Sequence, residues 1–442
     1  MNSKKVPVKS NRNLKDLYRL ITRSEKDKNF RTQLLADPKG TIEQELNIRL
    51  AEDHEIFIHE NSKGKTHLVI PPKCNISREE REAARTGVAS LDFLKRTMYN
   101  PAPPRRPSVE NNSAYIDKPR SKEILTNKVL ESIDRGLGFL ETTIVGNGVW
   151  HCIRYNLGDP NIPRHYERPP FVSAYCALAL ESCEHPKAQA ICTSSKQYIV
   201  DTMEFPGLWR YYRHLPQDLD STTTCSLVVS DHPWISFGQN ITKILSNRDG
   251  EGRFNTWILS PDEPDVVAKF RIEADPVVNA NVIALLGDCP ETKTIQKWLE
   301  TLLIEGNLED SSKWYPDNIA ICYAIARAVS RTQPALDHLR VPIADYVMAS
   351  CNKDQGFGNI LQTAQAITSL YGTHQLNRID PRRYSEIILN AQHDDGSWPE
   401  LLAFGDQKLM WGSFGQFGHA SESMTSAFCI EALVRLLETL EN

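Results

Sequence analysis

Six short apolar segments recur along residues 123–439. Each begins with small residues and ends with large aliphatic ones, at intervals of roughly 40 to 63 residues. They are VSAYCALAL (172–180), STTTCSLVV (221–229), VNANVIALL (278–286), NIAICYAIA (318–326), QTAQAITSL (362–370) and TSAFCIEAL (425–433). Their apolar residues fall on all sides of a helix, so the pattern predicts helices that are buried on every face.

Amphipathic segments alternate with these apolar ones. Examples are KVLESIDRGLGFLETT (128–143), AQAICTSSKQYIVDTM (188–203), TKTIQKWLETLLI (292–304), ALDHLRVPIADYVMAS (335–350) and RRYSEIILNAQ (382–392). Repeated helix pairs of this period bury each apolar helix between its neighbours. The pattern therefore predicts an all-α fold over residues 123–439, an α6/α6 toroid with six inner and six outer helices. An open solenoid is the alternative, but neither end offers the polar capping repeat that it would need.

The N-terminal part of the chain has a different pattern. Over residues 13–72, Leu14, Leu17 and Leu20 have helical spacing, and Asp37–Pro38 is a typical start for a further helix. Two alternating runs, EIFIHE and THLVIPP, follow and predict a β-hairpin. Residues 73–122 are rich in proline and polar residues, which predicts an extended linker. We therefore expect a small helical and β-hairpin domain, a linker and the toroid.

Composition and charge exclude several classes of function. The chain has 442 residues, is 40% hydrophobic and carries a net charge of -5, which argues against a nucleic-acid partner. No segment has the length and apolarity of a transmembrane helix, and no signal peptide is evident. The ten cysteines form no CxxC pair, which indicates reduced thiols and a cytoplasmic protein. There is no HExxH either, so no metal site is predicted.

A turn after the last amphipathic segment has a recognisable sequence. In QHDDGSW (residues 392–398), Gly396 permits a tight turn, Asp395 can bond the turn amides, and Trp398 can cover the neighbouring outer helix. With Gln392, the segment is similar to the QxxDGSW motif of squalene–hopene cyclases, related triterpene cyclases and, more loosely, protein prenyltransferase β subunits. A degenerate copy is CNKDQGFG (351–358). The resemblance implies the same α/α toroid.

The segment DLDS, residues 218–221, precedes the second apolar helix. It resembles the DxDD motif of class II terpene cyclases, with Ser221 in place of the last aspartate. The resemblance implies that Asp220 is a proton donor supported by Asp218. Two neighbouring carboxyls also raise the pKa of one of them and leave it a proton to donate. The alternative is that Asp220 is simply an N-cap.

Other polar and aromatic residues lie where loops lead into predicted inner helices. Asp275 is a candidate to support the acid, or a helix cap. The candidates for binding substrate, with aromatic faces able to stabilise a carbocation, are Trp209, Tyr212, Asn279, Tyr315, Trp411, Phe414 and His419. The alternative is that they cap helices or fill the throat of the toroid. Asp288, Cys289 and His419 are similar to the zinc ligands of prenyltransferase β subunits, but their spacing matches poorly.

The N-terminal unit has a resemblance of its own. Its order of helix, FRTQLLADPKGTIEQELNI, hairpin and HLVIPP looks like the nitrile-hydratase-like leader peptides of the proteusin type. These leaders precede ribosomally made, post-translationally modified natural products. The resemblance implies a recognition element for a peptide-modifying enzyme. The alternative is an accessory domain, and no double-glycine cleavage site follows Pro72.

Together these observations predict an enzyme that binds an isoprenoid and cyclises it after protonation, an isomerase or lyase of class II terpene cyclase type. No cofactor is implied, except that a prenyl diphosphate substrate would call for Mg²⁺. Most class II cyclases have a second toroid-like domain, whereas this chain has one toroid. The competing hypothesis is a component of a peptide natural-product pathway, with the leader as the recognised element and the toroid as a non-catalytic scaffold.

Overall fold

The computed structural model describes residues 20, 23–24, 26–46, 58, 119–145, 148–157, 161–212, 215–259, 273–309, 311–315, 317–352, 356–406 and 417–441. The chain divides into two compact units. One comprises residues 1–107 and 230–241, and the other comprises residues 108–229 and 242–442. The boundaries expected from the sequence, 13–72, 73–122 and 123–439, stay predictions.

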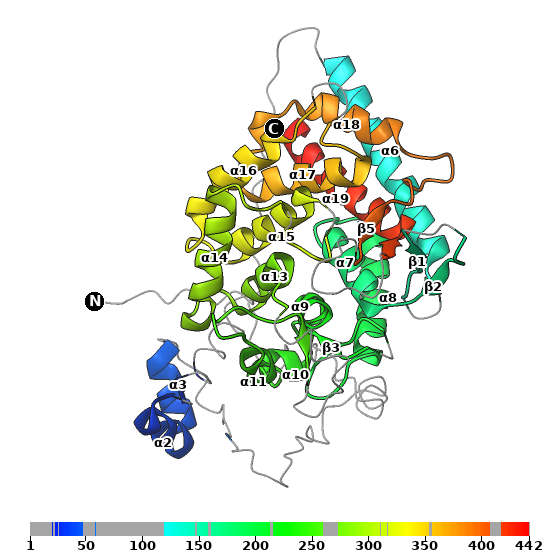
Figure 1. Ribbon diagram of the computed structural model, residues 1–442. Coiled ribbons are helices and arrows are strands. Elements are labelled where there is room, and N and C mark those ends of the chain that lie inside the picture. The colour runs from blue at the N-terminus through cyan, green and yellow to red at the C-terminus, as the bar shows by residue number, and fades with distance from the viewer. Residues whose placement is uncertain are drawn as a thin grey trace. The chain divides into compact units, whose positions relative to one another are not determined.

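The larger unit is built around a closed ring of inner helices (Figure 1). They are α7 (Pro170–Leu180), α9 (Leu219–Val228), α13 (Pro276–Leu286), α15 (Asn318–Arg331), α17 (Ile360–Gly372) and α19 (Glu422–Glu441). Each contacts the next in this order, and α19 returns to contact α7. Every residue of α7 and α13 is buried, as expected for helices enclosed by neighbours. The predicted toroid is therefore closed, not an open solenoid.

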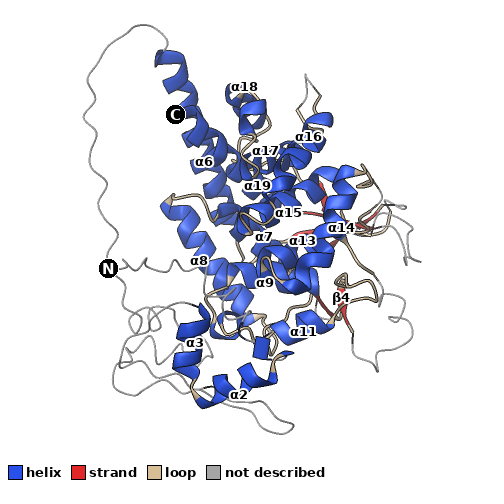
Figure 2. Cartoon of the chain, turned by 90° about the vertical axis from the view of Figure 1, so that its left-hand side faces the viewer, coloured by secondary structure: helices blue, strands red, loops and turns tan. Residues whose placement is uncertain are grey.

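Amphipathic helices cover this ring (Figure 2). They are α6 (Pro119–Thr143), α8 (Pro186–Asp201), α14 (Lys293–Ile304), α16 (Arg340–Ala349) and α18 (Pro381–Asn390). Between α9 and α13, the described residues of the larger unit form only the short helix α11 (Ile241–Ser246), whereas α10 (Pro233–Ser236) belongs to the smaller unit.

Short strands lie in the loops that lead into the inner helices. β1 (Cys152–Asn156), β2 (His165–Glu167), β5 (Leu402–Phe404) and β6 (Phe417–Ala420) form a sheet in the order β2-β1-β6-β5, and β3 (Gln217–Asp218) pairs with β4 (Trp257–Ile258). β2 leads into α7, β3 into α9 and β6 into α19. These strands fix the loops at the N-terminal ends of the inner helices, where the sequence places most of the candidate site residues.

Three tryptophans repeat one anchoring arrangement. Trp150, Trp209 and Trp398 are fully buried, and each donates its indole N–H to a carbonyl ten residues earlier, near the end of α6, α8 or α18. The acceptors are Leu140, Ile199 and Ile388, at 3.1, 2.8 and 2.9 Å. Two residues before each tryptophan is a glycine with φ between 91° and 112°. The sequence showed this geometry only at Trp398, because the other two turns lack the surrounding polar residues.

The turn at QHDDGSW joins the last outer helix to the first. Gln392 accepts a bond from the Ser132 hydroxyl of α6 and donates to the Ser132 carbonyl, at 2.7 and 3.0 Å. Asp395 accepts from the amide of Ser397 at 2.9 Å. A Cβ on Gly396 would lie 2.4 Å from the carbonyl oxygen of Arg135, so only glycine fits against α6. The turn thus ties α18 to α6 where the ring closes.

The smaller unit contains two of the expected N-terminal helices, α2 (Lys28–Ala36) and α3 (Pro38–Leu46). Its core cluster is Leu20, Phe30 and Leu34, against which Ile42 and Ile58 pack. The predicted hairpin lies outside the described residues, apart from Ile58, and so does the predicted linker up to residue 118. Residues 119–122, the end of that predicted linker, belong to α6. In the part of the chain that the structure describes, we find no helix with both the length and the apolarity to cross a bilayer. The nine cysteines described there are free thiols.

Candidate active site

Asp218, not Asp220, caps the second inner helix. Helix α9 begins at Leu219, and Oδ1 of Asp218 accepts the backbone N–H of Ser221 over 2.6 Å. The prediction that Asp220 could serve as the N-cap is wrong, because the strand β3 ends at Asp218 and the helix begins directly after it. Asp220 therefore lies in the first helical turn, where its side chain can reach the neighbouring inner helices.

The Asp220 carboxyl is held by two neutral donors from different elements. The Tyr315 hydroxyl, just before α15, donates to Oδ2 over 2.5 Å. The side-chain amide of Asn281, on α13, donates to Oδ1 over 2.8 Å. Asn281 and Tyr315 are 0% and 5% exposed, whereas Asp220 itself keeps some accessible surface. The carboxyl is thus fixed in orientation from two sides.

Asp218 and Asp275 have a different environment. The second carboxyl oxygen of Asp218 accepts the amide of Tyr211 at 2.9 Å. Asp275 caps α13 through the amide of Val277, at 2.9 Å, and accepts the Ser312 hydroxyl at 2.6 Å. Both carboxyls therefore order the loops on the N-terminal side of the ring. Asp275 is therefore a helix cap, which is one of the two roles that the sequence left open.

Burial makes all three carboxyls weak acids. It raises the pKa of Asp220 to about 7, against the opposing effect of the Tyr315 hydrogen bond, and the nearby Asp218 charge raises it further. Burial likewise raises the pKa of Asp218 to about 6 and that of Asp275 to about 7. Near neutral pH, Asp220 therefore carries a proton in a large fraction of molecules, which is the state that a general acid needs.

Arg327 orients the amide that contacts Asp220. It donates from Nη2 to Oδ1 of Asn281 over 2.6 Å, so the amide nitrogen of Asn281 must face Asp220. The guanidinium also lies over the rings of Tyr175 and Tyr323, at 5.0 and 5.4 Å from their centroids. Sequence analysis missed Asn281, Arg327 and Tyr175. The available signal was a polar or charged residue inside an otherwise buried helix, which requires a partner.

Aromatic side chains from three inner helices pack against one another near this acid. The ring centroids of Phe171 and Tyr175 are 4.8 Å apart, those of Tyr175 and Phe428 are 6.1 Å apart, and those of Phe428 and Tyr323 are 5.1 Å apart. These side chains come from α7, α15 and α19. Aromatic faces stabilise cations through their quadrupoles. The tyrosine and phenylalanine faces lie inside the inner ring, beside the elements that hold Asp220.

Several predicted site residues have structural partners instead. Asn279 donates to the carbonyl of Phe254 and accepts its amide, both over 2.9 Å, and so fixes the loop before α13. Trp209 anchors α8, as described above. Tyr212 is partly buried beside Tyr211, whereas Trp411 and Phe414 lie outside the described residues.

His419 does not join Asp220. The sequence indicated a loop there, but His419 lies in β6, because that segment pairs with β1 and β5, and it is 4% exposed. Its Nε2 lies 3.2 Å from Oε2 of Glu167, and its ring stacks on Phe404. Burial lowers the pKa of His419 despite the Glu167 carboxylate. The Tyr211 hydroxyl donates to the same carboxylate at 3.2 Å, so this cluster organises the sheet and the Asp218 loop.

Within the described ranges, no three His, Cys, Asp or Glu side chains gather closely enough to hold a metal ion. The three residues compared above with zinc ligands have other partners. Asp288 accepts bonds from Lys293 and Gln296, at 2.5 and 2.9 Å, and the Cys289 thiol lies 3.5 Å from the Thr292 hydroxyl.

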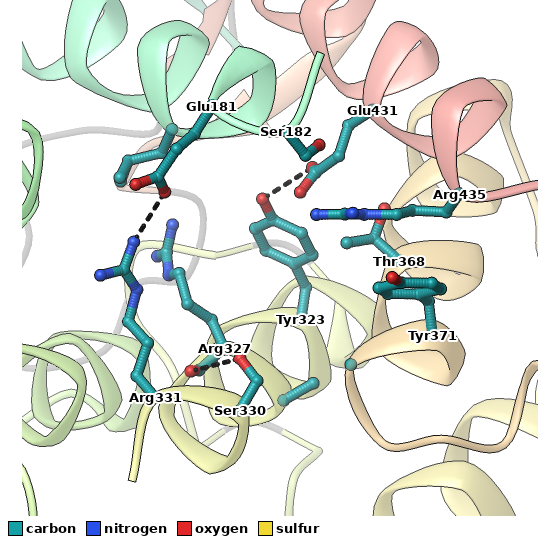
Figure 3. Close-up of a pocket in the computed structure, with 13 residues that line it drawn as sticks. Glu181, Ser182, Tyr323, Arg327, Ser330, Arg331, Thr368, Tyr371, Glu431 and Arg435 are labelled. Atoms are coloured by element: carbon teal, nitrogen blue, oxygen red, sulfur yellow. Dashed lines mark hydrogen bonds and ion pairs between the residues drawn. The ribbon is translucent and has the colours of Figure 1, made fainter. Parts of the chain in front are cut away.

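A cavity of about 360 Å³ opens at the C-terminal ends of α7, α15, α17 and α19 (Figure 3). Its polar lining includes Glu181, Arg327, Arg331, Tyr371, Glu431 and Arg435. Arg327 thus contacts both the Asn281 amide beside Asp220 and this cavity. The acid and the cavity are separated by the layer of Arg327 and the two tyrosine rings that flank it.

Comparison with known proteins supports the fold. The sequence matches no protein-family model and no curated protein. Among solved structures, 72% of this chain superposes on 99% of a variant of the type II terpene cyclase MstE from Scytonema, with bound geranylgeranyl dihydroxybenzoate, at a TM-score of 0.55 and 17% identity. A second MstE variant, with its product merosterolic acid A, gives 0.54 and 17%, covering 72% and 99% of the two chains. A protein from Actinoplanes gives 0.55 and 17%, covering 70% and 99%. The chain has a terpene-cyclase-like α/α toroid.

Proposed function

We propose that this protein is a terpene cyclase of the class II type, which protonates an isoprenoid and lets it cyclise inside the toroid. The observation that carries the proposal is the carboxyl of Asp220. It sits inside the inner ring with a pKa raised to about 7, held by Tyr315 and Asn281, while the buried Asp218 and Asp275 serve as caps. Asp218 and Asp275 support the acid by ordering the loops that carry Tyr211 and Ser312.

In the proposed reaction, the acidic proton of Asp220 passes to the less substituted carbon of the substrate's terminal double bond, so that the cation forms at the more substituted carbon. The alkene π electrons form the new C–H bond, and Asp220 is left as a carboxylate. The hydrogen bonds from Tyr315 and Asn281 strengthen at this moment, because their acceptor becomes charged. A second double bond of the substrate attacks the cation and closes a ring. Loss of a proton from the final cation gives a cyclic alkene with the composition of the substrate.

Two further observations support the proposal. Aromatic faces of Tyr175, Tyr323 and Phe428 lie inside the ring, where a carbocation would form. The solved type II cyclase MstE is covered over 99% of its length by 72% of this chain, so the matched region corresponds to nearly the whole of that cyclase chain. An acid directed inward and aromatic walls favour an isoprenoid over an inert peptide-binding scaffold. The leader-like role of residues 13–72 stays a separate prediction.

The test is a product assay by gas chromatography and mass spectrometry. Wild-type protein is incubated with squalene, farnesyl and geranylgeranyl diphosphates and a geranylgeranylated dihydroxybenzoate, with Mg²⁺ present for the diphosphates. The variant Asp220→Asn is the test, and Asp380→Asn, an exposed cap of the outer helix α18, is the matched control. A cyclic product that persists in the control and falls by at least about a hundredfold in Asp220→Asn supports the proposal. Absence of any cyclic product from folded wild-type protein would refute it for these substrates.

A further inference from the structure

The proposed reaction also needs a base, and that base has to lie away from Asp220. Each ring closure moves the positive charge along the prenyl chain, because the double bond that attacks one cation becomes the next. The last cation therefore forms at a distance from the carboxyl that began the reaction. The group that takes up the final proton must be uncharged and must have a free lone pair.

His419 has such a lone pair. Its side chain is 4% exposed, and Nδ1 is buried with no hydrogen-bond partner among the described atoms. Its Nε2 lies 3.2 Å from Oε2 of Glu167. An ionised carboxylate can only accept, so Nε2 carries the proton of the neutral imidazole and Nδ1 carries the lone pair. A buried polar atom without a partner is costly, and a ligand that reaches it removes that cost.

The neighbouring groups keep the imidazole of His419 neutral and Glu167 ionised. Burial lowers the pKa of His419 against the opposing effect of Glu167, and the charge of Arg154 lowers it further. Burial also acts to raise the pKa of Glu167, but hydrogen bonds and charges lower it on balance. They come from His419, from Arg154 at 2.7 Å and from the Tyr211 hydroxyl. A carboxylate beside a histidine stabilises the imidazolium that forms when the histidine takes up a proton.

A row of packed aromatic rings connects His419 to the acid. The His419 ring stacks on that of Phe404 at a centroid distance of 4.9 Å and an interplanar angle of 11°. Phe404 packs at 5.1 Å against Phe171, which packs at 4.8 Å against Tyr175. The Tyr175 hydroxyl lies 3.4 Å from that of Tyr315, which donates to the acid. A prenyl chain laid along these rings has its protonated end at the acid and its later cations nearer to His419, where aromatic faces stabilise them.

We propose that His419 is the base that ends the cyclisation, with Glu167 as the residue that positions it. This inference rests on the proposed function and assigns its last step. The Nδ1 lone pair takes a proton from a carbon next to the last cation, and the electrons of that C–H bond form the double bond of the product. The Glu167 carboxylate stabilises the resulting imidazolium. After the product leaves, water takes this proton from His419 and supplies one to Asp220.

The test compares the products of wild type and His419→Gln by gas chromatography and mass spectrometry. The glutamine amide can still donate to Glu167, but it has no basic lone pair. We expect the variant to consume substrate within about threefold of the wild-type rate, because Asp220 still starts the reaction. The share of the wild-type alkene should fall at least about tenfold, in favour of alcohols formed by water and of other alkene isomers. His338→Gln is the matched control and should keep the wild-type products, because it removes a surface histidine that lies 3.8 Å from Glu300.

Two further measurements guard against a variant that does not fold. His419→Asn, whose amide is not a base either, repeats the product assay. Nitrogen NMR of wild-type protein with isotope-labelled histidine reads the tautomer without turnover, and we expect Nε2 to be protonated and Nδ1 to be bare at neutral pH.

The inference and the proposed function fail in different ways. A protonated Nδ1, or wild-type products from a folded His419→Gln protein, would overturn the assignment of the base and leave the proposed function standing. If wild-type protein forms no cyclic product, the proposed function fails and the inference fails with it.

Discussion

The Tyr315 hydroxyl lies 2.5 Å from Oδ2 of Asp220, although 95 residues separate the two in the sequence. This bond joins the loop before α15 to the first turn of α9. The Tyr315 hydroxyl also lies 3.4 Å from that of Tyr175, which comes from α7. Tyr315 therefore links the Asp220 carboxyl to α7, and Asn281 links the same carboxyl to α13.

Tyr315→Phe should weaken the acid without removing it. The hydrogen bond from Tyr315 lowers the pKa of Asp220, so its loss should raise that pKa. Cyclisation requires the protonated acid, so the alkaline fall in kcat/KM should move to higher pH. The maximal rate should fall by about tenfold to a hundredfold, because the carboxylate formed in the reaction loses a charge-assisted bond. The measurement is the pH profile of kcat/KM for both proteins. An unchanged profile with a lower rate would mean that Tyr315 acts only through packing.

Asp220→Asn should stabilise the fold at alkaline pH. The folded pKa of Asp220 is raised from 3.8 to about 7, so the folded state holds a proton that the unfolded chain releases. The stability that the folded protein gains from holding this proton is fully present below about pH 4 and is lost as the pH rises to 7. Asparagine can accept from Asn281 and donate to Tyr315 without this penalty. We expect the variant to gain on the order of 1–3 kcal/mol over wild type between pH 5 and pH 8. Urea denaturation at both pH values measures this, and a difference that does not change with pH would contradict the buried acid.

Asn279→Ala should mainly lower the stability of the fold, and Asn281→Ala should mainly lower the activity, although the two residues lie two positions apart on α13. Asn279 bonds the backbone of Phe254, so its loss leaves a buried amide and carbonyl unpaired and should cost about 2–3 kcal/mol of unfolding free energy. Product formation by the folded fraction should stay near wild type. Asn281→Ala should instead reduce kcat/KM, because it removes a donor to Asp220. Thermal unfolding and kinetics of both variants test this. If Asn279→Ala instead kept full stability and raised KM, Asn279 would be a substrate-binding residue.

Gly396→Ala should destabilise the closed ring. Gly396 has a φ of 91°, and an added Cβ would lie 2.4 Å from the Arg135 carbonyl oxygen, so strain and a clash should together cost about 3 kcal/mol. Gly138, in α6, is the matched control, because a Cβ there would meet no atom within 4 Å. Gly138→Ala should stabilise by up to about 1 kcal/mol through helix propensity. The denaturant midpoints of both variants measure this. Equal effects of the two substitutions would contradict a close contact between position 396 and the Arg135 carbonyl.

Much of the fold was predictable because its signals are local. The apolar runs such as 278–286 and the amphipathic segments such as 292–304 differ in periodicity, and the periodicity alone predicts which helices are enclosed. The segment 392–398 identified one ring-closing turn. The equivalent turns at Trp150 and Trp209 were missed, because they share only the glycine two residues before the tryptophan and lack the glutamine and aspartate of segment 392–398.

The sequence resemblance named Asp220 as the candidate acid but left open the alternative that Asp220 is the N-cap of the following helix. The pairing of β3 with β4 ends the strand at Asp218 and makes it the cap, which leaves Asp220 directed at α13 and α15. Asn281 and Arg327 become partners of this acid only when the six inner helices close into a ring. The sequence by itself determined which helices are buried, because burial follows from each segment's own pattern. Which polar groups meet inside the ring was decided by the tertiary structure, because those contacts join helices distant along the chain.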